Sequence, residues 1–389
     1  MRVVLLLFLI MAFCGPALAW QHMHADTIPQ KKDIGPITIP LPKVQPFPRN
    51  DSAKQPLARK NLLAFPFVVK SLETNWGFGA IAARFFRPGK DTTIRTSDVN
   101  ILGLYTLRSQ VIVALSSTIF FPKEDHIFRF QSSYSYYPDD FWGLGNHTPD
   151  SAKEGFSQTQ YFINPQFLQR VHKSLYVGVT YEFQHTDPVN YEEGGVFDKE
   201  DIIGRHGGNT SGIGPILSWD TRNNAYSPDR GAFAEIQYVW FPSFLGSDFY
   251  FTVLSIDLRK FFRLDDNSVL AVQALGGLTF GNTPFRKLEE LGGTDMMRGY
   301  YGGRYTDKCL MAYQAEYRRH LFWRIGVVAF AATGEVAPTP GRFELDGLHF
   351  TGGAGVRFAL SQEEKLNLRF DFGVAQHSNA FAIQLREAF

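Results

Sequence analysis

Apolar and polar side chains alternate along most of this chain, and that alternation limits it to β-structure. In residues 364–375, for example, Phe370 and Phe372 lie on one face of an extended chain, whereas Arg369 and Asp371 lie on the other. A period of two residues is the signature of a strand, and the alternating region carries no 3.6-residue stripe typical of an amphipathic helix. The sequence therefore predicts an all-β fold.

The alternating segments have the length of strands that cross a membrane. Most contain about ten residues or more, enough for a tilted strand to cross a bilayer, whereas strands of soluble sandwiches usually have about five or six. Charges stay on one face, which suits a polar lumen, because Arg or Lys facing lipid at the midplane costs about 2–4 kcal/mol. Aromatic residues, 15% of the chain, are expected on the lipid face and at the interfaces. We predict a 16-stranded antiparallel transmembrane β-barrel of the outer-membrane type.

The connections between the expected strands differ systematically in length. The strands are expected at 64–72, 75–87, 92–107, 109–121, 125–137, 157–171, 174–187, 209–222, 231–241, 249–263, 267–280, 308–321, 323–336, 348–360, 364–375 and 380–389. The long connections, 138–156, 188–208, 281–307 and 337–347, all follow odd-numbered strands. Outer-membrane barrels have short periplasmic turns and long outer loops. Both termini are therefore expected in the periplasm of a Gram-negative bacterium.

The first residues predict export. Residues 1–19 have the features of a secretory signal peptide, with a positive charge at Arg2, apolar residues at 3–13 and small residues at the 17–19 cleavage site. The apolar run is too short to cross a bilayer as a helix. A lipoprotein signal around Cys14 is the alternative interpretation.

A basic, proline-rich segment follows at residues 20–60. Such a composition favours an extended linker over a packed domain, so the segment is expected to be a periplasmic linker that could bind a separate periplasmic protein. The barrel domain is then expected to span residues 61–389.

Charge and motif content exclude several classes of function. The chain carries 39 Lys and Arg against 38 Asp and Glu, a net charge of +1, which gives no basic field for nucleic acid. It has neither a His-Glu-x-x-His zinc motif nor a Gly-x-Ser-x-Gly nucleophile elbow. His185, Asp187 and the acidic run 198–201 could catch a divalent cation, but a solvated loop is favoured. We expect no enzyme activity, catalytic residue, metal or cofactor, and the outer-membrane lipid bilayer as the main partner.

Two motifs narrow the barrel to one family. The first runs from 291 to 307 as LGGTDMMRGYYGGRYTD, and the second covers SWDTRNN at 218–224 with PDRG at 228–231. They resemble the sixth outer loop and the strand-eight-to-nine turn of the BamA/TamA superfamily, the bacterial surface antigen family. Residues 65–69 and 73–79 are similar to the first hairpin of its shorter members. The resemblance covers about residues 63–389.

The resemblance implies a sixth outer loop that folds into the barrel, with Arg298, Gly299 and Tyr300 at its tip. A buried arginine needs a carboxylate, and in the family a strand-twelve Glu and a strand-thirteen Asp supply it. Glu316 matches the first, but Ala332 stands where the family has the Asp, so another acid is needed or the loop is held more weakly. A solvated Arg298 is the alternative.

The second motif predicts a tight turn. Asp220 can pair with Arg222 or Arg230, and Gly231 lets the chain reverse. We interpret this cluster as structural.

The ends of the barrel carry two further features. Phe381, Ile383, Leu385 and Phe389 step along one face and resemble the C-terminal signal by which outer-membrane barrels are recognised for assembly. Pro66 in the first strand lacks a ladder donor, so the junction of the first and last strands, the seam, could be weak. A simple strand-start proline is the alternative reading of Pro66.

The family inserts or translocates outer-membrane and secreted proteins, and some relatives handle lipids. Its members usually carry periplasmic POTRA domains, and residues 20–60 are too few to form one. The resemblance therefore predicts an assembly barrel without POTRA domains that assists insertion or translocation through a weak seam. A passive pore or structural envelope barrel that retains the fold is the alternative.

Overall fold

The computed structural model describes residues 62–89, 94–362 and 365–389. The expected signal peptide at 1–19 and linker at 20–60 lie outside these residues. No helix within them is long and apolar enough to cross a membrane.

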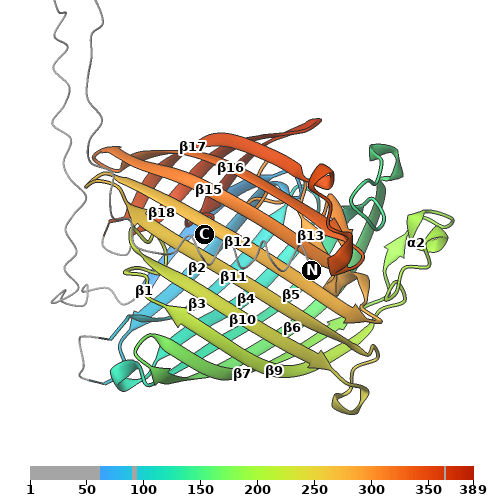
Figure 1. Ribbon diagram of the computed structural model, residues 1–389, viewed down its shortest axis with the longest axis horizontal. Coiled ribbons are helices and arrows are strands. Elements are labelled where there is room, and N and C mark those ends of the chain that lie inside the picture. Colours follow the sequence, from blue (N-terminus) through green and yellow to red (C-terminus); the bar gives the residue numbers. More distant parts are fainter. Residues whose placement is uncertain (1–61, 90–93, 363–364) are drawn as a thin grey trace, which may run out of the picture. The chain divides into compact units, whose positions relative to one another are not determined.

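Sixteen long strands of the described chain form one antiparallel sheet that closes on itself (Figure 1). They are β1 Leu62–Ser71, β2 Asn75–Phe86, β3 Ser97–Thr106, β4 Val111–Phe120, β5 His126–Phe141, β6 Glu154–His172, β7 Leu175–Thr186, β9 Gly208–Asp220, β10 Gly231–Phe241, β11 Phe251–Arg263, β12 Ser268–Gly281, β15 Cys309–Phe322, β16 Ile325–Ala337, β17 His349–Ser361, β18 Leu366–Ala375 and β19 Ser378–Leu385. The predicted 16-stranded barrel is confirmed. Most strand ends fall within a few residues of their predicted positions, and β5 and β6 extend furthest beyond theirs.

Shorter elements lie in the connections. They are the strands β8 Asn190–Tyr191, β13 Glu289–Leu291 and β14 Tyr305–Asp307, the helix α2 Val196–Lys199, and the 3-10 turns η1 Pro122–Glu124, η2 Asp150–Ala152, η3 Ser243–Leu245, η4 Phe285–Lys287, η5 Pro340–Arg342 and η6 Leu345–Gly347. The long connections gather at one end of the barrel together with α2 (Figure 1). We call this end the long-loop rim and the other the short-turn rim. That the short-turn rim faces the periplasm stays a prediction.

The pairing of neighbouring strands is extensive everywhere except at the seam. All ten residues of β1 pair in register with β2. Between β1 and β19, the described residues give one register pair, Lys70 with Ile383. The barrel is therefore closed by its weakest strand contact.

The barrel wall is apolar outside and polar inside. On β18, Phe372 and Val374 face outward and are 50% and 51% exposed, whereas Arg369 and Asp371 point inward and are 2% and 1% exposed. Lipid covers the outward face, so alternation places charges in the lumen, where they find partners. The lumen is thus filled by paired polar side chains near β18.

Some aromatic residues occupy a place that the sequence did not predict. Four phenylalanines from four segments pack together beneath the long loops: Phe141, Phe156, Phe197 and Phe285. The expectation that aromatics lie only on the lipid face and interfaces is therefore wrong. These rings give the long-loop rim an apolar core of its own.

Candidate functional site

Loop 6, residues 282–308 between β12 and β15, folds into the barrel. At its tip Arg298 is 3% exposed, and its Nη1 lies 2.7 Å from Glu316 Oε2 and 3.0 Å from Asp371 Oδ2. The guanidinium also lies over the Phe330 ring, 3.5 Å from its centroid. Two carboxylates and an aromatic face compensate the burial of the charge. Glu316 is the partner that the sequence predicted.

Asp371 is the carboxylate that the sequence left unidentified. It comes from β18, whereas the family pattern places the second acid at the position of Ala332 on β16. Ala332 is buried in an apolar cluster with Met297 and Tyr300 of loop 6. The alternation of β18 had already placed Asp371 in the lumen, but not beside Arg298. A carboxylate from a different wall strand therefore replaces the missing one.

The turn of the loop tip depends on close backbone contacts. Gly299 has a φ of 126°, a region that favours glycine. Opposite it, a Cβ on Gly373 of β18 would lie 2.3 Å from the Arg298 carbonyl oxygen. Tyr300 is buried and packs edge-on against Tyr305 and His349. The tip therefore fits tightly against β18, with its aromatic side chain held on the other side.

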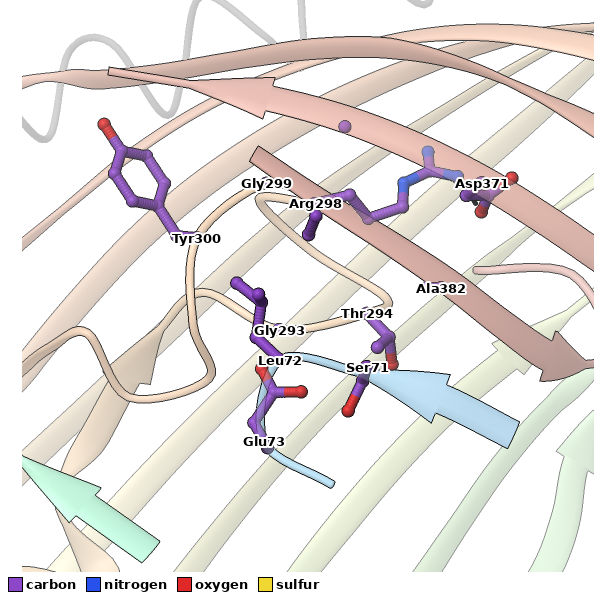
Figure 2. Close-up of a pocket in the computed structure, with 12 residues that line it drawn as sticks. Ser71, Leu72, Glu73, Gly293, Thr294, Arg298, Gly299, Tyr300, Asp371 and Ala382 are labelled. Atoms are coloured by element: carbon purple, nitrogen blue, oxygen red, sulfur yellow. Dashed lines mark hydrogen bonds and ion pairs between the residues drawn. The ribbon is translucent and has the colours of Figure 1, made fainter. Parts of the chain in front are cut away.

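Loop 6 contacts both sides of the seam. The Gly302 main-chain N–H donates to Glu73 Oε1 in the β1–β2 turn (2.5 Å). Ser378 Oγ, at the start of β19, donates to the Gly299 carbonyl oxygen (2.6 Å). Figure 2 shows Arg298 reaching toward Asp371 while the end of β1 lies across from β19. The loop thus bridges the two strands that share one register pair.

Further contacts fix the outer part of the loop. Tyr301 donates its hydroxyl to Asp139 Oδ1 (2.6 Å) and accepts from Arg108 Nη1 (2.7 Å). Burial raises the pKa of the Tyr301 phenol, which keeps it protonated as the donor to Asp139. Arg304 pairs with Asp150 at 2.7 Å. These contacts join loop 6 to three other loops and strand ends.

The turn motif forms a compact polar cluster at the short-turn rim. Asp220 accepts from Arg222 Nε (2.9 Å) and from Arg95 Nη1 (2.8 Å). Arg230 is exposed and instead donates its main-chain N–H to Asn223 Oδ1. Of the two arginines considered for Asp220, Arg222 pairs with it, and the sequence gave no sign of Arg95. The cluster therefore links the β2–β3 connection, which carries Arg95, to the turn between β9 and β10.

Gly231→Ala is expected to destabilise the barrel by about 1–3 kcal/mol, because a side chain there is both strained and crowded. The φ of Gly231 is 100°, and a Cβ would lie 2.2 Å from the Thr221 carbonyl oxygen. Urea unfolding in micelles measures the change. Gly246→Ala is the control, since Gly246 also has a positive φ, 90°, with no atom within 4 Å of its Cβ. Equal losses would show that the Thr221 contact adds nothing.

The expected row of C-terminal apolar residues ends before Phe389. Phe381 is exposed, and Ile383 and Leu385 are partly so. The chain then turns at Arg386, whose φ is 73°, and Phe389 is buried in a cluster of residues from β11 and β12. Phe389 therefore does not share their face. Their role as an assembly signal stays a prediction.

Pro66 lies opposite Ala80 in the β1–β2 register. Its position in β1 agrees with a weakly paired seam, although the role of the proline itself stays a prediction.

Of the residues considered for a cation, His185 lies near the end of strand β7 and not in a loop, and its Nε2 is 3.2 Å from Asp187 Oδ1. Among the described residues, no three His, Cys, Asp or Glu side chains are placed to hold a metal ion.

Comparison with solved structures shows similar barrels. BamA from Haemophilus ducreyi lacking POTRA domains 1–3 is 13% identical with a TM-score of 0.55, covering 83% of this chain and 70% of that one. CdiB from Acinetobacter baumannii is 13% identical with a TM-score of 0.56, and the match covers 84% of this chain and 60% of that one. CdiB from Escherichia coli is 9% identical with a TM-score of 0.58, and the match covers 84% of this chain and 63% of that one. At these identities the likeness shows the fold.

Comparison of the sequence with family models identifies the family. No curated protein matches the chain. The Omp85 superfamily domain, however, matches residues 108–384, well over half of the chain, and this range includes both loop 6 and the turn motif. The assignment made from those motifs is confirmed, and such barrels belong to the outer membrane. The chain is a member of the Omp85 superfamily.

Proposed function

We propose that this protein assists the insertion or translocation of outer-membrane proteins or lipids through the seam between β1 and β19. The observation that carries the proposal is the single register pair, Lys70 with Ile383, at the seam. Unpaired main-chain N–H and C=O groups are costly in lipid, so a membrane barrel normally pairs every edge. The edges of β1 and β19 therefore offer hydrogen bonds to an incoming strand.

The filled interior favours this proposal over a passive pore. Arg129 on β5 pairs with Glu235 on β10 at 2.7 Å, although the two strands are not neighbours in the sheet. Loop 6 occupies the lumen beside β18 through the buried Arg298. A steady wide channel would need these contacts to be absent. The function is thus better described as a gated seam than as an open lumen.

The proposal also covers where the protein acts and by what chemistry. The protein is exported to the outer membrane of a Gram-negative bacterium, with the short-turn rim and both termini in the periplasm. It acts by binding and guiding strands or lipids, without a catalytic step or cofactor. A separate periplasmic protein is the partner proposed for the basic segment 20–60.

Locking the seam is expected to abolish this activity. Lys70→Cys with Ile383→Cys, in a Cys309→Ala background, places two thiols on directly opposed residues, whose Cβ atoms lie about 4.5–5.5 Å apart in an antiparallel pair. Cells depleted of the native protein and supplied with this variant are assayed for folded outer-membrane barrels. We expect at least a tenfold loss under oxidising conditions and recovery after reduction.

Ile236→Cys with Ile256→Cys is the matched control, because these residues are also directly opposed but lie on the fully paired strands β10 and β11. It should form a disulfide without loss of barrel insertion. If the seam disulfide forms and insertion is unchanged, the seam is not the route and the proposal fails.

A further inference from the structure

Loop 6 and the residues after β19 meet in one connected set of buried ion pairs. We call the set the lumen charge cluster; its members are Arg298, Glu316, Arg318, Arg357, Arg369, Asp371 and Glu387. All seven are less than one-tenth exposed. Arg298 belongs to loop 6 and Glu387 to the segment 386–389, while the other five are fixed on β15, β17 and β18. Two elements outside the wall strands therefore share one set of charges.

Arg357 connects the two elements through carboxylate side chains, and Arg318 connects them through Glu316 and the Phe389 carbonyl oxygen. Arg357 Nε donates to Glu387 Oε2 (2.7 Å) and its Nη1 to Asp371 Oδ1 (2.5 Å). Its Nη2 lies 3.5 Å from Glu316 Oε2. Asp371 and Glu316 are also the two carboxylates that hold Arg298. Arg357 thus shares Asp371 and Glu316 with Arg298 of loop 6, and Glu387 takes part of the Arg357 charge away from those two acids.

The balance of charge in the cluster depends on Glu387. β15, β17 and β18 contribute three arginines and two carboxylates to the cluster, an excess of one positive charge, and Arg298 adds a second. Glu387, which pairs with Arg357, and Asp295 of loop 6, which pairs with Arg369, supply the two remaining negative charges. Without Glu387, the docked cluster would keep one uncompensated positive charge beside Arg298, and like charges repel strongly where water is scarce.

We propose that Arg357 is a positioning residue that couples the docking of loop 6 to the docking of residues 386–389. With Glu387 in place, Arg357 divides its positive charge among three carboxylates, so Asp371 and Glu316 keep negative charge for Arg298. When Glu387 leaves, Arg357 draws on those acids and loop 6 loosens. By linkage, release of Arg298 must weaken the docking of Glu387 by the same factor.

The coupling reaches the seam through the path of the chain. Continuing the antiparallel register of Lys70 and Ile383, residues 386–389 would lie opposite residues 64–67 of β1. In the structure they turn inward instead, and Arg318 Nη2 donates to the Phe389 carbonyl oxygen (2.9 Å). Undocking these residues would make them available to β1 while loosening loop 6. This consequence rests on the proposed function, whereas the coupling itself does not.

Hydrogen exchange on the purified full-length chain in micelles tests the coupling without an activity assay. Glu387→Gln is expected to speed exchange in loop 6, residues 292–304, by roughly tenfold, within the range of typical couplings. Arg298→Gln should speed exchange in residues 380–389 by a similar factor. Glu235→Gln, which breaks a lumen pair outside the cluster, should change neither region.

The double variant Glu387→Gln with Arg357→Gln separates coupling from simple damage. Removing Arg357 restores the charge balance of the wall, so loop 6 should exchange more slowly than in Glu387→Gln alone. Arg357→Lys should stay closer to the native protein than Arg357→Gln. If the double variant is worse than either single one, or if Glu387→Gln leaves loop 6 unchanged, the coupling is overturned. The seam disulfide reports on the proposed function independently.

Discussion

Glu316→Gln is expected to destabilise the barrel by about 3–5 kcal/mol, the range for removing one partner from a buried ion pair. The Glu316 side chain is 0% exposed and lies within 4 Å of three guanidinium groups, those of Arg298, Arg318 and Arg357. Glutamine keeps the size of the side chain but removes a buried negative charge that all three guanidinium groups share. Urea unfolding in lipid vesicles, followed by tryptophan fluorescence, measures the free energy of unfolding.

Glu235→Gln provides the matched control elsewhere in the lumen. Glu235 also pairs with an arginine, Arg129, but the two side chains are 19% and 24% exposed. Water screens that pair, so we expect a loss of about 1 kcal/mol or less. Equal losses from the two substitutions would mean that the lumen charge cluster is no more buried in solution than the Arg129 pair.

Gly373→Ala is expected to displace the tip of loop 6 without changing any charge. The added Cβ would lie 2.3 Å from the carbonyl oxygen and 2.6 Å from the carbonyl carbon of Arg298. Backbone atoms cannot give way as a flexible side chain does, so the loop or β18 must move at a cost of about 1–3 kcal/mol. A loss of that size corresponds to roughly 5- to 150-fold faster hydrogen exchange in residues 292–304.

Gly103→Ala controls for the effect of alanine on a strand, because no atom lies within 4 Å of a Cβ built on Gly103 of β3. It should leave the exchange of loop 6 unchanged. Slow exchange in loop 6 of Gly373→Ala would show that the tip does not rest on β18 in solution.

These two variants separate the forces that hold loop 6. Glu316→Gln removes electrostatic compensation and keeps the shape of the lumen, whereas Gly373→Ala keeps every charge and alters one backbone contact. If loop 6 holds the two sides of the seam together, both substitutions should speed hydrogen exchange in loop 6. Both should also loosen the contacts of the loop with Glu73 and Ser378. If loop 6 only occupies space in the lumen, the substitutions would lower the stability of the barrel without loosening the contacts at Glu73 and Ser378.

Parts of the site were predictable because they depend on local pattern. The Arg-Gly-Tyr sequence at 298–300 marks a charged residue beside a sharp turn, and alternation on β15 points Glu316 inward. The same alternation on β18 put Asp371 in the lumen. Which acids meet Arg298, however, depends on how far apart the wall strands lie around the barrel. That separation is set by strand tilt and stagger.

The sequence by itself determined the number of strands, the approximate limits of most of them and which face of each strand is polar. Lipid outside and paired charges inside impose the same two-residue period on every strand, so each could be recognised alone. Only the tertiary structure decided that Asp371 replaces the acid missing at Ala332, that Phe389 turns into the lumen, and that the seam keeps one register pair. Those outcomes depend on contacts across the lumen between residues far apart in the chain, and no local period encodes them.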